Sequence, residues 1–133
     1  AGSAKNPRIM AYYAYAGLTP PNDEAFEWCG FAFGAWVIEE GGAPPASWWY
    51  PDSWATWGTA LPLSGAPEPG AVLVKKGTNT HVAIIAGISP PGARPWISGW
   101  GVCTLGGNQG GKVTIGDWAP LSDYKAMRAP PTW

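Results

Sequence analysis

Charged residues are scarce in this sequence of 133 residues: they make up 13% of it and leave a formal net charge of −1. Nucleic-acid binding depends on dense positive charge, so we expect no nucleic-acid partner. No run of about 18 apolar residues occurs, so we also expect no membrane span. The opening AGSAKNPRIM lacks the apolar segment of a signal peptide.

Cysteine and histidine are scarce too. Two cysteines allow at most one disulfide, which excludes a disulfide-stabilised scaffold. One histidine, two cysteines and scattered carboxylates contain no pair with the spacing of a zinc site. Neither a phosphate-binding glycine loop nor a G-x-S-x-G motif occurs. We therefore expect neither a metal ion nor a cofactor.

Tryptophan, glycine and proline are abundant instead. Ten tryptophans are more than a core of this size absorbs, so some should lie at the surface, where their rings suit a groove. The 19 glycines and 15 prolines imply many loops between short elements, whereas the apolar fraction of 46% argues against disorder. The length favours one domain over residues 1–133.

Helices are predicted in the first third of the chain. Asn6 and Pro7 are typical of a helix start, and Gly17 of its end. A second helix is predicted over residues 27–40, ending at Gly41–Gly42 and apolar on nearly every face, so we expect it to be buried. Residues 43–69 read as a long loop with one helical turn near Trp54.

Strands are predicted from Gly70 onward. AVLVKK and THVAIIAGI are separated by GTN, which indicates a hairpin. Further strands are predicted in PWISGWGVCTL, which GGNQGG breaks, in KVTI and in DYKAMRAP. Helices followed by an antiparallel meander of about five strands predict an α+β fold.

Cys29 lies in EWCGFAFGAW, near the start of the second predicted helix. If that helix starts near Glu27 or Trp28, Cys29 occupies the first turn, where N–H groups and the helix dipole favour a thiolate. If Asn22 or Asp23 is the N-cap, Cys29 falls in the second turn and the dipole argument weakens. The alternative interpretation is a buried core cysteine.

His81 and Asn108 are the other candidates for chemistry. His81 opens the most apolar strand, where it can face a cleft, and a protonated imidazole would lower the pKa of a nearby thiol. The alternative is a surface histidine beside a hairpin. Asn108 lies in a glycine-rich turn after a strand, and its amide could accept the Nδ1–H of an imidazole. The alternative for Asn108 is a purely structural role, because asparagine is common in turns. Gln109 is the neighbouring candidate for the same role as Asn108. Cys103 is expected to pack in the core.

A cysteine on a helix, a histidine opening a strand and a polar residue after the next strand follow the chain order of papain-like cysteine hydrolases. More specifically, the sequence resembles the CHAP and NlpC/P60 group of bacterial and phage cell-wall hydrolases, and a small CHAP-like subfamily most of all. The stretches that carry the resemblance are EWCGFAFGAWV, SWATWG, PGAVLVKKGTNTHVAII, LGGNQGGKVTI and YKAMRAP.

The resemblance implies a papain-like fold and a thiol mechanism without a metal. Cys29 would be the nucleophile at a helix start, His81 the general base and acid, and Asn108 the residue that orients His81. The reaction would be cleavage of an amide bond in the peptide of peptidoglycan, by an amidase or endopeptidase, through a thioester acyl-enzyme. We expect substrate contacts from five tryptophans and one glutamine: Trp28, Trp48, Trp49, Trp54, Trp100 and Gln109. Packing of the long loop onto the domain is the alternative for most of these tryptophans.

The resemblance also sets expectations about biology. Peptidoglycan would be the partner of a monomeric protein that is secreted, periplasmic or active at the cell wall. If the protein is a secreted toxin, an immunity protein would inhibit it. Two other classes of function remain open: a non-catalytic, tryptophan-rich module that binds wall glycan, and a related fold that keeps a dead site for protein–protein contact.

Overall fold

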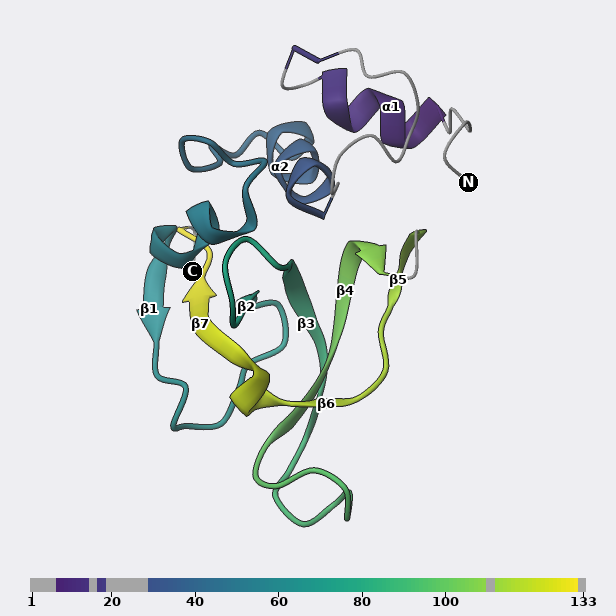
Figure 1. The fold of residues 1–133 in the computed structure, drawn as a ribbon. Helices are drawn as coiled ribbons and strands as arrows, with labels where there is room; N and C mark the ends of the chain where they lie inside the picture. The colour runs from purple at the N-terminus through teal and green to yellow at the C-terminus, as the bar shows by residue number, and fades with distance from the viewer. Residues whose placement is uncertain (1–6, 15–16, 19–28, 110–111, 132–133) are drawn as a thin grey trace.

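The computed structural model describes residues 7–14, 17–18, 29–109 and 112–131. Within these residues two α-helices come first, and the strands that follow form one antiparallel sheet (Figure 1). The elements in chain order are α1 (Pro7–Ala14), α2 (Cys29–Glu39), the 3₁₀ helix η1 (Pro51–Thr56), β1 (Thr59–Leu61), β2 (Val72–Lys75), β3 (Val82–Ser89), β4 (Gly101–Gln109), β5 (Lys112–Ile115), β6 (Ala119–Pro120), the 3₁₀ helix η2 (Leu121–Asp123) and β7 (Tyr124–Ala129).

The sheet confirms the α+β class but has more strands than predicted. Its order is β1-β7-β2-β3-β4-β5, and β6 pairs with β4. About five strands were predicted, and the described residues form seven. The two short strands that the sequence pattern missed are β1, which pairs with β7, and β6, which pairs with the start of β4. Both strands are too short for their sequences to show the alternation of apolar and polar residues that predicts a strand.

Glycines end both helices as predicted. Gly17 has a φ of 77°, and its N–H donates to a carbonyl at the end of α1. After α2, Gly41 has a φ of 81° and the N–H of Gly42 donates to the carbonyl of Val37 at 2.8 Å. This left-handed glycine and its backward hydrogen bond satisfy carbonyls that the helix end leaves unpaired. None of the described helices is long and apolar enough to cross a bilayer.

The predicted limits of the third strand were wrong at both ends. Residues 95–99 form turns and bends, and β4 begins only at Gly101. The glycine-rich segment does not break the strand, because Gly106 pairs with Thr114 and the end of β4 pairs with the start of β5. Glycine weakens a strand but offers the same backbone donor and acceptor as other residues. Pairing with β5 therefore carries β4 through Gln109.

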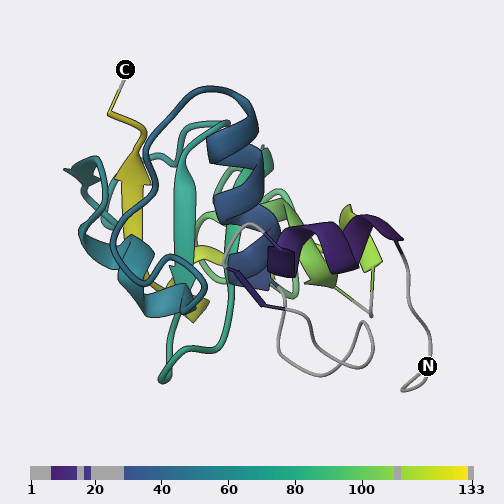
Figure 2. The same ribbon diagram turned by 90° about the horizontal axis from the view of Figure 1, so that it is seen from above.

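Both faces of the sheet are covered, which explains the uninterrupted apolar run of β2. Val72 and Val74 pack in one core cluster with α1, α2 and η1. The alternate residue Leu73 packs in a second cluster with residues of η2 and β7. α2 packs against β3 and β4. Figures 1 and 2 show α2 over the end of the sheet where β3 begins and β4 ends.

Candidate active site

Cys29 is the first residue of α2 as the structure describes it. It is 2% exposed and opens a run of seven buried residues that anchors the helix in the core. N–H groups in the first turn of a helix have no intrahelical acceptor, and the dipole there is positive. Both features stabilise negative charge on a sulfur or on a reacting carbonyl oxygen. Trp28 and the predicted helix start at Glu27 lie outside the described residues.

Two glycines let the long loop dock directly on this helix. A Cβ on Gly34 would overlap the ring of Trp48, and a Cβ on Gly30 would overlap the carbonyl oxygen of Trp49. Only a residue without a side chain permits this approach at either position. The loop therefore clamps α2 near its N-terminal end, so that Cys29 sits on a rigid element.

His81 was predicted to open a strand, and in the structure it immediately precedes β3. Its carbonyl oxygen accepts the N–H of Lys75 at 2.9 Å, which extends the β2–β3 pairing to the histidine. The half-buried side chain lines a pocket of about 430 Å³ together with Thr104, Asp117 and Tyr124 among others. Of the residues that the structure describes, Cys29 does not line this pocket.

Tyr124 gives the His81 pocket a neutral hydroxyl. Burial raises the pKa of Tyr124 above its ordinary value, and a side-chain hydrogen bond with Thr104 opposes that rise. The phenol therefore stays protonated at neutral pH and can donate a hydrogen bond. Sequence reasoning missed Thr104, Asp117 and Tyr124 as neighbours of His81. The one available signal was Thr104, a polar residue inside an apolar strand.

Asn108 lies near the end of β4, the strand that pairs with β3. β3 and β4 pair with Ile85 opposite Thr104 and Ile84 opposite Leu105. These are the last β3–β4 pairs at that end, and the β4–β5 register shifts between Gly106 and Gln109, so Asn108 lies beyond the continuous register. The sequence placed Asn108 in a turn after the strand; the structure places it within β4. The side chains of Asn108 and Gln109 lie outside the described part of the structure.

The helix that carries Cys29 meets the strand that follows His81. Cys29 and Val82, the residue after His81, belong to the same core cluster. In Figures 1 and 2 the N-terminal end of α2 lies at the end of the sheet where β3 begins and β4 ends. Cys29, His81 and Asn108 thus belong to chain segments that meet at one end of the sheet.

The two cysteines do not form a disulfide. Cys103 is half-buried in β4, on the strand position opposite Gly87. A Cβ on Gly87 would lie 2.9 Å from the Cys103 Sγ, so the sulfur packs over the glycine backbone. Because Cys103 packs elsewhere in the sheet, the Cys29 sulfur remains a thiol.

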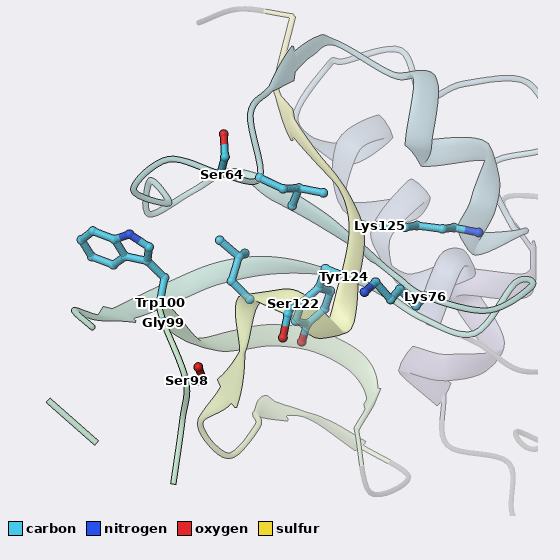
Figure 3. Close-up of a pocket in the computed structure, with 10 residues that line it drawn as sticks. Ser64, Lys76, Ser98, Gly99, Trp100, Ser122, Tyr124 and Lys125 are labelled. Carbon is cyan, nitrogen blue, oxygen red and sulfur yellow. The ribbon is translucent and has the colours of Figure 1, made fainter. Parts of the chain in front are cut away.

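The tryptophans divide between the core and the surface. Trp54 is fully buried and donates from Nε1 to the carbonyl of Trp48 at 2.8 Å, Trp48 is 8% exposed, and Trp49 is half-buried. These positions fit the interpretation that the long loop packs onto the domain. Trp100 is half-buried and lines a second pocket of about 660 Å³ (Figure 3), whereas Trp96, which sequence reasoning did not select, is 69% exposed.

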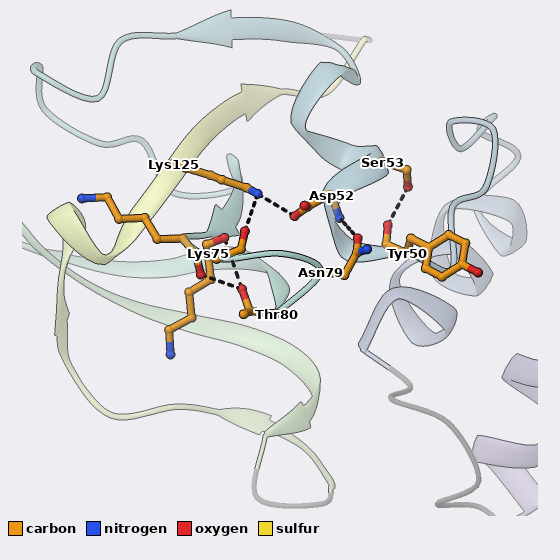
Figure 4. Close-up of polar contacts among 9 residues, drawn as sticks. Tyr50, Asp52, Ser53, Lys75, Asn79, Thr80 and Lys125 are labelled. Carbon is orange, nitrogen blue, oxygen red and sulfur yellow. Dashed lines mark hydrogen bonds and ion pairs between the residues drawn. The ribbon is translucent and has the colours of Figure 1, made fainter.

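A polar network holds the turn that leads to His81 (Figure 4). The Lys125 ammonium lies 2.8 Å from a carboxylate oxygen of Asp52 and donates to the carbonyl of Gly77 at 2.6 Å. Asn79, at a φ of 49°, accepts the N–H of Asp52 through its side-chain oxygen at 3.1 Å. These contacts tie the β2–β3 turn to η1 and β7. Sequence reasoning missed the network because its members come from three separate segments.

No family model, curated protein or solved structure matches this chain with statistical significance. The candidate site thus consists of a thiol at the start of a buried helix, a histidine before an adjacent strand, and an asparagine near the end of the neighbouring strand β4. These are the residue types of a nucleophile, a general base and an orienting group.

Proposed function

We propose that this protein is a cysteine hydrolase that cleaves an amide bond in the peptide of peptidoglycan, as an amidase or endopeptidase. Cys29 is the nucleophile, His81 the general base and acid, and Asn108 the residue that orients the imidazole. The observation that carries the proposal is that Cys29, at the start of α2, packs in the same core cluster as Val82, the residue after His81.

The finer fold assignment is part of the same proposal. Two helices precede an antiparallel sheet, the cysteine begins the second helix, and the histidine precedes a central strand. That arrangement supports a papain-like fold of the CHAP and NlpC/P60 kind. Such a protein would act on the cell wall as a secreted or periplasmic monomer.

The chemistry proceeds in two halves. His81 takes the thiol proton as the Cys29 Sγ attacks the amide carbonyl, and N–H groups at the start of α2 stabilise the resulting oxyanion. The C–N bond breaks as His81 returns the proton to the leaving amine, which gives a thioester. His81 then deprotonates a water that attacks the thioester carbonyl, and the C–S bond breaks to release the acid and regenerate the thiol.

Access to the sulfur requires local opening. Cys29 is 2% exposed, and a nucleophile must come within about 3–3.5 Å of the carbonyl carbon that it attacks. His81 by contrast already lines an open pocket with polar walls. The scissile amide is thus expected to enter from the His81 side and to reach Cys29 when the start of α2 is uncovered.

The decisive experiment is lysis of purified cell walls by Cys29→Ala beside the parent. Cys103→Ala is the matched control, because it removes the other thiol without touching the proposed site. We expect Cys29→Ala and His81→Ala to abolish lysis and Cys103→Ala to retain it. Comparing Asn108→Ala with Gln109→Ala identifies which of the two residues orients His81. Equal lysis by the parent and Cys29→Ala would end the enzyme assignment, and mass spectrometry of the new termini would identify the bond cut.

A non-catalytic wall-binding module is the second candidate, and one exposed cluster favours it. Trp96 is 69% exposed, and the Arg94 guanidinium carbon lies 5.7 Å from its ring centroid and 4.1 Å from that of Trp118. An exposed indole beside a cation is a surface on which a sugar ring can stack. Co-sedimentation with walls that is lost in Trp96→Ala, combined with no lysis by the parent, would favour this module over the hydrolase.

A further inference from the structure

A second pocket lies beside the His81 pocket and has a distinct composition. It measures about 660 Å³, within the range of small-ligand sites. Among its lining residues are three serines, Trp100, Tyr124 and two lysines, and none of the described lining residues is acidic. Figure 3 shows Trp100 at one end and Lys76 and Tyr124 toward the other.

Lys76 is the cation that this pocket can offer a ligand. The Lys125 ammonium is already engaged by Asp52 and by the carbonyl of Gly77 (Figure 4), and in Figure 3 its side chain points away from Trp100. Lys76 is exposed, and no ion pair within the described residues engages its ammonium. A ligand carboxylate would therefore meet an ammonium that is not held in an ion pair among the described residues.

Hydroxyl groups flank that charge. Ser122 and Tyr124 both line the pocket, and Figure 3 shows their hydroxyls pointing the same way. Tyr124 is buried and Ser122 is exposed, so one hydroxyl is fixed and the other is adaptable. Trp100 supplies an aromatic surface at the opposite end, and Leu63 is among the other lining residues. A ligand that fits carries a carboxylate on one part and a ring or apolar face on another.

The pocket adjoins the candidate active site at Tyr124. That residue lines both pockets, and the consecutive residues Lys75 and Lys76 line one each. A chain-like substrate held at His81 would therefore extend past Tyr124 toward Trp100. A sugar–peptide conjugate has the required length and chemistry.

We propose that the pocket of Lys76, Ser122 and Trp100 binds the carboxylate-bearing sugar–peptide part of the substrate, with the carboxylate at Lys76 and the sugar face on Trp100. The assignment of the ligand to the wall rests on the proposed function. Binding itself does not depend on cleavage, so the two can be tested apart.

The test uses the Cys29→Ala chain, which cannot cleave, and two probes. One is N-acetylmuramoyl-L-alanyl-D-glutamate, and the other is the same molecule with both carboxylates amidated. Titration calorimetry gives the Kd, and the indole ¹H–¹⁵N signals, assigned for Trp100 with Trp100→Phe, locate the site. We expect the acid to bind about fivefold or more tightly than the amide, and added salt to weaken binding of the acid alone.

Variants make the result specific. Lys76→Gln should remove the preference for the acid, while Arg8→Gln, the same charge change at an exposed residue of α1, should keep it. Equal affinity for acid and amide, an unchanged preference in Lys76→Gln, or a Trp100 indole signal that does not shift would each overturn the proposal. If the acid binds at Lys76 but the parent protein does not lyse walls, the binding site is supported and the assignment as a hydrolase is contradicted.

Discussion

Replacing Lys125 by Met tests whether the network around the β2–β3 turn supports His81. Methionine keeps an apolar side chain beside the pocket of Lys76, Ser122 and Trp100 but removes the ammonium. The change breaks the 2.8 Å ion pair with Asp52 and the 2.6 Å hydrogen bond to the carbonyl of Gly77. His81 follows that turn directly, so loosening the turn should disturb the histidine.

The expected loss of stability is modest. The side chains of Lys125 and Asp52 are 34% and 30% exposed, so solvent screening leaves the ion pair about 0.2–1 kcal/mol. The hydrogen bond to Gly77 adds about 1 kcal/mol. We therefore expect the free energy of unfolding to fall by about 1–2 kcal/mol. Arg8→Met is the matched control, because it removes the same charge and breaks another 2.8 Å ion pair, with Glu39, on a more exposed side chain.

Urea denaturation of the three chains measures the stability, and wall lysis at saturating substrate measures the rate of the folded protein. Lys125→Met should shift the urea midpoint more than Arg8→Met does, with an unchanged m-value. It should also slow lysis at temperatures where it is fully folded, and Lys125→Arg should restore the rate. If Lys125→Met and Arg8→Met behave alike in both assays, the network does not position His81.

Two further predictions concern single side chains. At about pH 6, iodoacetamide reacts with activated thiolates in preference to ordinary thiols, so it should modify Cys29 before the more exposed Cys103. Peptide mass spectrometry gives the order of modification. Earlier modification of Cys103 would contradict the assignment of Cys29 as nucleophile. Burial raises the pKa of Tyr124, so the unfolded chain releases the phenol proton at a lower pH than the folded chain does. The stability that this residue contributes is complete below about pH 10 and declines above it. Urea denaturation should therefore show a steeper loss above pH 10 for the parent than for Tyr124→Phe, and parallel curves would refute the pKa shift.

Local sequence was sufficient for much of the fold. Pro7 begins α1, Gly41 and Gly42 follow the end of α2, and the β2–β3 hairpin forms around the turn that GTN predicts. These features depend on the backbone preferences of one or two residues, so neighbours in the sequence are enough to predict them. The positions of Cys29 near a helix start and His81 before a strand follow from the same local signals.

Tertiary pairing decided the remainder. β1 and β6 form only against strands far away in the sequence, and Asn108 lies in β4 because β5 continues the sheet beyond the glycines. The sequence left Trp54 as either a substrate contact or a packing residue of the long loop, and it is fully buried because α2 and the sheet offer it a place to pack. Strand register, side-chain burial and the two pockets that Tyr124 lines all arise from contacts between distant segments. The local sequence pattern therefore does not predict them.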